Sequence, residues 1–252
     1  MTTYDVFLYA GEAEMADLRV RTLAPAGVES IAVSCDRTYQ GDPAGTMIEP
    51  PGVADWLWVH ATPNPDGTRG FHVEHQHRVG VTEAVRTFAR ADDLVLVSDV
   101  DEIPDPARLA EVRSLAMSGS WVSLRQRMHG FALDYLLDRD WYGTTAAMAV
   151  NVDAAGQRNV TAPTGSVVHE AGWHLSWLGT PAQRARKLAT FTHIELAGLD
   201  TEACYRDARH ANGEALRRLD RPQMAALVWP QPFYDAWPVP DCWWAPGSLG
   251  GR

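Results

Sequence analysis

The stretch Asp92-Asp93-Leu94-Val95-Leu96-Val97-Ser98-Asp99-Val100-Asp101-Glu102-Ile103-Pro104 joins a short apolar run to an acidic turn. Residues 94–97 have the length and β-branched content of a buried strand. The carboxylates follow at the carboxyl end of that strand, which is the edge where open α/β sheets bind ligands. Asp99 and Asp101 are two residues apart, so they share one face of an extended chain. Paired carboxylates suit Mg²⁺ or Mn²⁺, which commonly also hold substrate phosphates.

A purely structural interpretation of the same turn is also open. Pro104 could begin a helix, with Asp101 near its N-cap and Glu102 placed favourably for the helix dipole. An Asp-x-Asp pair is in addition common in solvated loops. The buried strand in front of the pair is therefore the feature that favours a ligand site.

Composition limits the classes of partner. The chain has 252 residues, enough for one large α/β domain or two small ones, and 46% of them are hydrophobic. The formal net charge is -10, and no run of five or six basic residues occurs. Because phosphate contacts need clustered Lys and Arg, we expect no nucleic-acid partner. An acidic protein can still bind a single nucleotide through a metal ion.

Cysteine usage and hydropathy indicate the compartment. Cys35, Cys204 and Cys242 are scattered and form no Cys-x-x-Cys motif, which is typical of reduced thiols in a cytosolic protein. The N-terminus lacks the basic and apolar regions of a signal peptide, and the chain lacks an apolar run long enough to cross a bilayer. We therefore expect a cytoplasmic protein with no membrane span.

Strand and helix patterns alternate through the first hundred residues. Strands are predicted at residues 6–9, 30–34, 56–60 and 94–97, and helices at residues 14–24 and 71–91. This order predicts a mostly parallel sheet with helices on its faces. Right-handed crossovers bring the carboxyl ends of all strands to one edge. We expect that edge to collect Glu12, Asp36, His60, Asp99 and Asp101.

The second half is richer in β-structure and is compatible with antiparallel pairing. Strands are predicted at residues 121–128, 132–137 and 144–152, and helices at residues 106–117, 181–189 and 202–218. No internal repeat or clear linker separates the halves. A single domain over residues 1–252 is therefore the simplest interpretation.

A second concentration of chemistry lies between residues 169 and 195, which hold His169, His174 and His193 together with two tryptophans. Indole rings offer broad apolar faces on which sugars and bases can rest. The alternative is that Trp173 and Trp177 are core residues and that each histidine is merely hydrogen-bonded. The density of the cluster favours a binding site.

Six segments, taken in order, resemble glycosyltransferase family 17, the family of the β-1,4-mannosyl-glycoprotein N-acetylglucosaminyltransferase. They are Gly11-Glu12 with Leu18-Arg19, Thr38-Tyr39-Gln40-Gly41, Gln76 with Arg78, Asp93 to Pro104, Gly172-Trp173-His174-x-Ser176-Trp177, and Lys187 with Phe191-Thr192-His193-Ile194-Glu195. The most specific are Asp-Val-Asp-Glu-Ile-Pro and Gly-Trp-His. Val79 and Leu175 stand where the family has asparagine and cysteine.

The resemblance implies an α/β fold of the glycosyltransferase A type, with a Rossmann-like, mostly parallel sheet. Residues 1–104 would form a nucleotide-binding half, and residues 105–252 a β-containing, acceptor-side half. The implied reaction is inverting transfer of a sugar, such as N-acetylglucosamine, from a UDP-sugar to an acceptor hydroxyl. The acceptor would be a carbohydrate or small molecule that the sequence does not identify.

The resemblance also implies roles for individual residues. Asp99 and Asp101 would hold Mn²⁺ or Mg²⁺, completed by His193 or His174. The nucleotide would contact Glu12, Arg19, Asp36, Arg78, Asp99 and Lys187. Inversion needs a carboxylate base, and Glu170 is the first choice, with Glu102, Asp134 and Glu195 as alternatives. The acceptor would contact Trp173, Trp177 and Glu195.

Three other functions compete with this one. A metal-dependent sugar-nucleotide phosphohydrolase or nucleotidyltransferase would also use an acidic pair, but residues 10–12 make a poor phosphate-cradling loop. A zinc enzyme could use His72, His75 and His77, although a helix places only the first two on one face. A non-catalytic carbohydrate-binding protein could use the tryptophans.

Overall fold

The computed structural model describes residues 1–64, 71–119, 121–153, 160–163, 165–196, 198–220 and 223. The chain forms two compact units. The first consists of Met1–Gln126, Asp140–Trp173 and Thr190–Ile194, and the second of Arg127–Arg139, His174–Ala189 and Glu195–Arg252. The units thus alternate along the chain and do not divide it at residue 104. A single domain over residues 1–252 stays a prediction.

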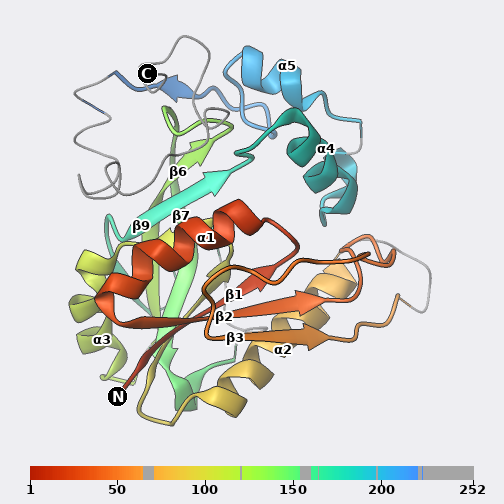
Figure 1. Ribbon diagram of the computed structural model, residues 1–252. Coiled ribbons are helices and arrows are strands. Elements are labelled where there is room, and N and C mark those ends of the chain that lie inside the picture. The colour runs from red at the N-terminus through yellow and green to blue at the C-terminus, as the bar shows by residue number, and fades with distance from the viewer. Residues whose placement is uncertain are drawn as a thin grey trace. The chain divides into compact units, whose positions relative to one another are not determined.

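The first unit is built on parallel strands with helical crossovers, as the sequence predicts (Figure 1). Its strands are β1 (Thr3–Tyr9), β2 (Val28–Cys35), β3 (Asp55–Val59) and β4 (Leu94–Asp99), in the order β3-β2-β1-β4. The connecting helices are α1 (Ala13–Leu23), which runs into the short 3₁₀ helix η1 (Ala24–Ala26), and α2 (Phe71–Phe88). Leu8 pairs with both Val33 and Asp99, so the carboxyl ends of these strands share one edge.

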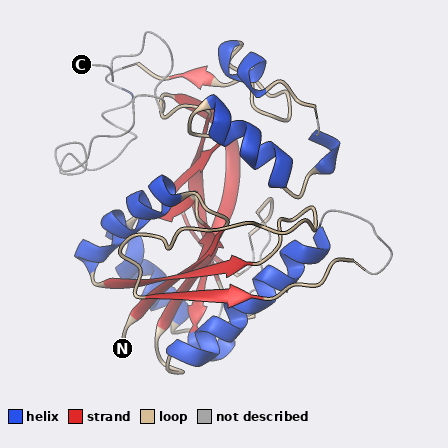
Figure 2. Cartoon of the chain, turned by 45° about the vertical axis from the view of Figure 1, so that its right-hand side comes forward, coloured by secondary structure: helices blue, strands red, loops and turns tan. Residues whose placement is uncertain are grey.

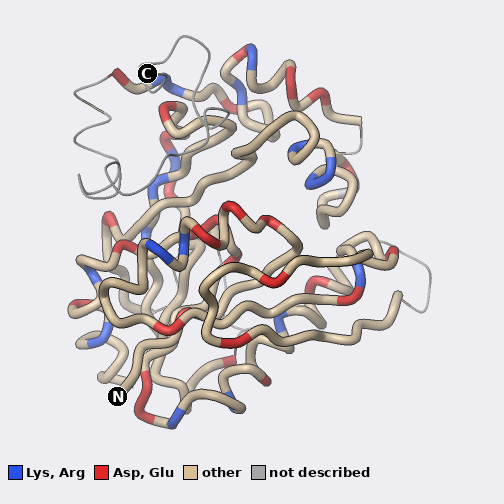
Figure 3. The backbone as a smooth tube through the Cα atoms, viewed as in Figure 1, with Lys and Arg blue, Asp and Glu red and all other residues tan. Residues whose placement is uncertain are grey.

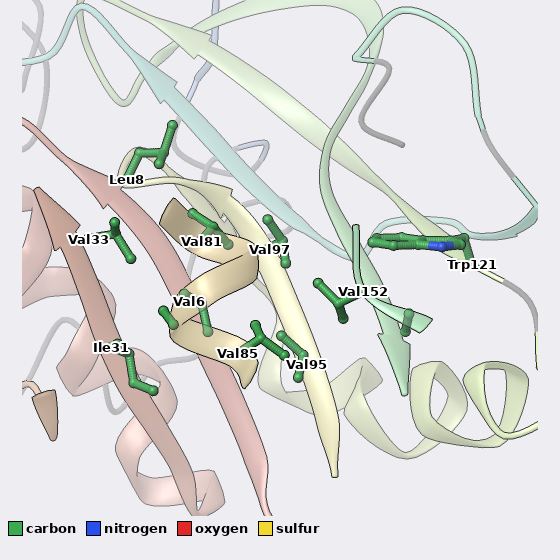
Figure 4. Packing of buried hydrophobic residues seen from close by; sticks show 12 residues of the cluster. Val6, Leu8, Ile31, Val33, Val81, Val85, Val95, Val97, Trp121 and Val152 are labelled. Carbon is green, nitrogen blue, oxygen red and sulfur yellow. The ribbon is translucent and has the colours of Figure 1, made fainter. Parts of the chain in front are cut away.

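Helix α2 covers one face of this sheet. Strand alternation turns Val6, Ile31 and Val97 toward it, and Val81 and Val85, four residues apart, meet them from the helix (Figure 4). Each such side chain contributes roughly 1.5–3 kcal/mol when fully buried. Helix α2 comes close to strand β3 at Gly80, where an added Cβ would lie 2.1 Å from a methyl carbon of Val59.

The opposite face carries helices α1 and α3 (Leu109–Ala116), the latter preceded by the 3₁₀ helix η2 (Pro106–Arg108) (Figure 2). Leu94 and Leu96, which alternate with the residues that face α2, pack with Val112 of α3. The interpretation in which Asp101 caps a helix is wrong. Asp105 is the cap, since its side chain accepts from the Ala107 N–H at 2.9 Å.

Further strands extend the sheet. They are β5 (Glu102–Pro104), β6 (Val122–Gly130), β7 (Tyr135–Met148), β8 (Ser166–Val168) and β9 (Gly172–Ser176), and β7 leads into the 3₁₀ helix η3 (Ala149–Asn151). The order continues from β4 as β7-β6-β9-β5, with β7 antiparallel to β4 and β8 parallel to β6. Strands β6, β7 and β9 each contribute residues to both units.

The prediction of two strands at residues 132–137 and 144–152 is wrong, because β7 is continuous. Its charged middle, from Asp138 to Asp140, has the composition of a loop. Each charge finds a partner from another part of the chain: Arg217 meets Asp138, Glu214 meets Arg139, and Arg125 meets Asp140. These ion pairs are largely exposed, so each contributes only about 0–1 kcal/mol to the strand that carries it.

The second unit contains most of α4 (Pro181–Thr190), most of the 3₁₀ helix η4 (Ile194–Leu196), α5 (Thr201–Arg206) and β10 (Arg217–Arg218). The helix predicted at residues 202–218 is wrong. Asp200 caps α5, but the helix ends at Arg206, and Ala208 adopts a left-handed conformation with φ 50°. Burial of His129 and His210 lowers the pKa of each imidazole to about 4.

Basic residues lie on many of the described elements. Figure 3 shows Lys and Arg scattered among many elements, and the short helix α4 carries Arg184, Arg186 and Lys187. Within the described part of the chain, no helix combines the length and the apolar character needed to cross a membrane.

Candidate active site

The backbone of the acidic turn, residues 99–102, is held by a buried arginine. Arg19 of α1 is fully buried and forms a two-bond ion pair with Asp5, with N···O distances of 2.7 and 2.6 Å. Its remaining donors reach Ser98 Oγ at 2.5 Å and the carbonyl oxygens of Asp99 and Glu102 at 2.9 and 2.8 Å. A guanidinium has five N–H donors, and here all five have acceptors. Arg19 therefore positions the turn, which differs from its predicted contact with the nucleotide.

Glu102 supports the same turn from within the sheet. Its side chain has no exposed surface, and its two carboxylate oxygens accept from the Trp141 indole N–H and from the backbone N–H of Asp99, both at 2.8 Å. Gly143 makes room for it, because a Cβ there would lie 2.4 Å from the Glu102 carboxyl. This geometry makes Glu102 a support for Asp99 and does not favour it as a base.

Asp99 is the most accessible carboxylate of the turn, with 34% of its side chain exposed. Arg78 Nη2 lies 3.2 Å from Asp99 Oδ1 and 2.7 Å from Glu74 Oε1. Burial by itself would lower the pKa of Arg78, but the carboxylates of Asp99 and Glu74 outweigh burial and raise that pKa. An arginine fixed between two carboxylates thus stands beside the edge of the sheet.

Helix α2 brings a distant segment to the same place. Phe71, Glu74 and Arg78 share one helical face. Thr192 Oγ1 donates to Glu74 Oε2 at 2.5 Å, and the His193 ring packs edge-on against Phe71 with 5.5 Å between ring centroids. The structure therefore brings His193 to the helix that carries Arg78. Sequence reasoning missed Glu74 and Thr192, although the four-residue spacing of Glu74 and Arg78 was visible.

A tyrosine and a buried histidine complete this cluster. His77 Nε2 lies 2.6 Å from the Val33 carbonyl oxygen, so Nε2 carries the proton and Nδ1 accepts from the Tyr39 hydroxyl at 3.1 Å. Burial lowers the pKa of His77 to about 4, and the ring is neutral. Burial, and then the charges of Asp99 and Glu74, raise the pKa of Tyr39.

These bonds overturn the zinc hypothesis. Both ring nitrogens of His77 are engaged, while His75 is exposed and His72 is partly buried on the same helix. The three imidazoles therefore cannot act as one ligand set.

The ends of the other strands carry polar groups at the same edge, as the sequence predicts. Asp36 Oδ2 lies 3.2 Å from His60 Nδ1, and Asp36 Oδ1 accepts from the Ala61 N–H at 2.9 Å. Burial opposes ionisation of Asp36, but the Ala61 N–H and the His60 ring outweigh it and lower the pKa of this carboxyl. Glu12 accepts from the Ala10 N–H at 3.0 Å.

Close backbone packing joins residues 171–172, which follow Glu170, to residues 103–105. Gly172 has φ 141°, and a Cβ there would lie 2.2 Å from the Ile103 carbonyl oxygen. The Asp105 N–H donates to the Ala171 carbonyl oxygen at 2.9 Å. Glu170 is exposed in the turn before β9, in a left-handed conformation with φ 49°.

The family model of glycosyltransferase family 17 matches residues 1–198. The chain belongs to glycosyltransferase family 17. It is therefore a transferase that uses a sugar donor and an acceptor, and the hydrolase and carbohydrate-binding alternatives lose their support. No curated protein matches the chain. One matching solved structure, described as "Crystal structure of S. aureus TarS 1-349", is 8% identical with a TM-score of 0.37, and the match covers 81% of this chain and 74% of that one.

Other predicted residues of this family 17 transferase are buried. Asp101 is 7% exposed, Trp173 is 5% exposed and Trp177 is 3% exposed. In the second unit, Trp177 stacks on Phe131, and Lys187 Nζ lies 5.6 Å from the centre of the Trp177 ring. These contacts cover the Trp177 ring with protein, and Trp173 is buried, so neither tryptophan is an open platform for an acceptor.

The other predicted site residues of the second unit differ in burial. Asp134 is 2% exposed and accepts from Arg218 Nε at 3.2 Å, which makes it a structural ion pair and disfavours it as a base. His174 is 6% exposed, whereas Glu195 is exposed.

Asp99 and Asp101 suit a metal ion that is held jointly by protein and substrate better than one held by protein ligands alone. In the part of the chain that the structure describes, no three His, Cys, Asp or Glu side chains are arranged to hold a metal. The four predicted ligands, Asp99, Asp101, His174 and His193, therefore do not form one group. Mg²⁺-like ions are commonly held by one or two carboxylates together with substrate phosphates. The oxygen chemistry of Asp99 and Asp101 fits that second arrangement.

Proposed function

We propose that this family 17 transferase moves a sugar, N-acetylglucosamine, from a UDP-sugar to an acceptor hydroxyl with inversion and with the help of Mn²⁺ or Mg²⁺. The supporting observation is Asp99. It stands partly exposed at the carboxyl edge of the parallel sheet, and Arg19, Glu102 and Arg78 all hold it in place. Such rigid support is what a site for a charged donor requires.

The donor would lie along this edge. Asp99 and Asp101 would hold the ion together with the diphosphate oxygens, and the ion would neutralise charge on the departing diphosphate. Arg78 offers a second positive charge, already directed by Glu74. Asp36 and Glu12, at the ends of neighbouring strands, are candidates to contact the nucleoside.

Glu170 is the best candidate for the base. In an inverting transfer the acceptor oxygen bonds to the anomeric carbon as the bond from that carbon to the phosphate oxygen breaks, and the acceptor proton passes to a carboxylate. Glu170 is exposed, and the next residue, Ala171, accepts from the Asp105 N–H. Glu102 and Asp134 are buried with their carboxylates already bonded.

A thermal-shift and calorimetry screen of UDP-, GDP- and dTDP-sugars, each with and without Mn²⁺, tests this function. We expect UDP-sugars to stabilise the protein only with the metal, and Asp99→Asn to abolish the effect. Asp92→Asn, the same substitution in the exposed residues before β4, is the matched control. Equal stabilisation by UDP-sugars with and without Mn²⁺ would refute metal-dependent donor binding.

A further inference from the structure

Glu74 has no role assigned by the sequence, yet its carboxylate connects two parts of the site. Oε1 accepts from Arg78 Nε and Nη2 at 3.0 and 2.7 Å, and Arg78 in turn lies 3.2 Å from Asp99. Oε2 accepts from Thr192 Oγ1 at 2.5 Å. The side chain of Glu74 is 17% exposed, so water competes weakly for these bonds.

The bond from Thr192 to the Glu74 carboxylate is a short, directional contact of residues 190–193. Residues 190–193 also make a bond from the Tyr39 N–H to the Thr190 carbonyl at 3.2 Å, a long bond from Gln40 to the Phe191 carbonyl at 3.5 Å, and ring packing of His193 on Phe71 and Phe191. Hydrogen bonds to an ionised acceptor are roughly twice as strong as neutral ones. Because Thr192 directly precedes His193, its bond to Glu74 fixes the backbone from which His193 projects.

We propose that Glu74, acting through Thr192, is a positioning residue that sets His193 at the donor site and links it to Asp99 through Arg78. The inference rests on the proposed function, in which Asp99 and Asp101 hold the ion, and it adds His193 to the groups that contact the metal–diphosphate part of the donor. One carboxylate thereby fixes a cation and an imidazole that come from distant parts of the sequence. Removing a partner that orients a metal-contacting group typically weakens metal affinity about 10- to 100-fold.

Thr192→Val tests the link, because it removes the hydroxyl at almost constant size, while Thr192→Ser keeps the hydroxyl. The probe is Mn²⁺ with UDP, and its dissociation constant is measured by electron paramagnetic resonance without any turnover. We expect Thr192→Val and Glu74→Gln to weaken Mn²⁺ binding about 10-fold or more, and Thr192→Ser to restore it.

Two substitutions on the exposed part of α2 serve as matched controls. Thr87→Val removes a hydroxyl that donates to the Glu83 backbone carbonyl, and Glu83→Gln neutralises an exposed carboxylate on the same helix. Both should bind Mn²⁺ and UDP as the unmodified protein does. Weakening by the controls equal to that by Thr192→Val would overturn the proposal, because it would show a general effect of altering α2.

A double-mutant cycle with His193→Ala decides whether Thr192 acts through His193. In the His193→Ala background, Thr192→Val should cause no further loss of Mn²⁺ affinity. Full additivity, or an unchanged affinity in Thr192→Val alone, would overturn the role of Glu74 and Thr192. If His193→Ala and Asp99→Asn both bind Mn²⁺–UDP normally, the proposed donor site fails as well, which distinguishes the two outcomes.

Discussion

Replacing Arg19 by methionine should separate the stability of the fold from the order of the donor site. Arg19 and Asp5 form an ion pair in which neither side chain has exposed surface. Arg19→Met would leave the Asp5 carboxylate buried beside apolar groups, and breaking one side of such a pair costs about 3–5 kcal/mol. This is a large part of the stability of a typical protein, which is about 5–15 kcal/mol.

The double variant Asp5→Leu/Arg19→Met removes both charges. Because buried pairs replaced together by apolar residues are often no less stable, we expect it to regain most of the unfolding free energy. It still lacks the bonds from Arg19 to the carbonyl oxygens of Asp99 and Glu102. Binding of Mn²⁺–UDP should therefore remain weak in the double variant although its fold is restored.

Urea unfolding followed by circular dichroism measures the first quantity, and calorimetry with UDP and Mn²⁺ measures the second. Arg19→Lys is the control for charge, since it keeps the cation but loses the five-donor geometry. An unfolding free energy of Arg19→Met within about 1 kcal/mol of the unmodified protein would refute the argument from the uncompensated buried carboxylate. Normal UDP binding by the double variant would refute the positioning of the turn by Arg19.

Three further predictions concern other parts of the molecule. The buried histidines His77, His129 and His210 have folded pKa values of about 4, against about 6.5 when unfolded. The unfolded chain therefore binds more protons than the folded chain between about pH 4 and pH 6.5. The unfolding free energy is at its full value above about pH 6.5 and falls by about 3 kcal/mol per histidine as the pH approaches 4. Circular dichroism against pH should show acid unfolding, and His129→Gln should move the midpoint of that transition to lower pH. Gly172→Ala should destabilise the fold by several kcal/mol through its collision with the Ile103 carbonyl, measured by urea unfolding; a loss below about 0.5 kcal/mol would contradict the close approach. Glu170→Gln should lower kcat by about 100-fold or more while leaving UDP affinity unchanged, and an unchanged kcat would remove Glu170 as the base.

The sequence predicts well those features that depend on local periodicity. Short apolar runs rich in β-branched residues identify strands β1, β2 and β4, and the order of elements places Asp36 and Asp99 at one edge, as the register of Leu8 with Val33 and Asp99 bears out. Helix α2 follows from its apolar spacing, and the structure ends it at Phe88.

Features that depend on distant partners could not be predicted. In the sequence, Arg19 looks like any other residue of a helix. Only the fold shows that its guanidinium donates to Asp5 and to the carbonyl oxygens of the turn. Glu74 resembles a surface partner of Arg78 at four-residue spacing, and its bond to Thr192 joins positions 118 residues apart. The burial of Trp177 under Lys187 and Phe131 likewise depends on tertiary packing that composition does not reveal.

The alternation of the two compact units along the chain has a consequence for how the protein is made. The first unit needs Thr190–Ile194 in addition to its two earlier segments. A ribosome delivers the N-terminus first, at roughly 5–20 residues per second, so Glu74 emerges well before Thr192 is synthesised. During that interval the donor edge of the nascent chain lacks its last segment. A product that ends before residue 190 would therefore contain strands β1 to β9 without Thr192, the residue that Glu74 is placed to hold.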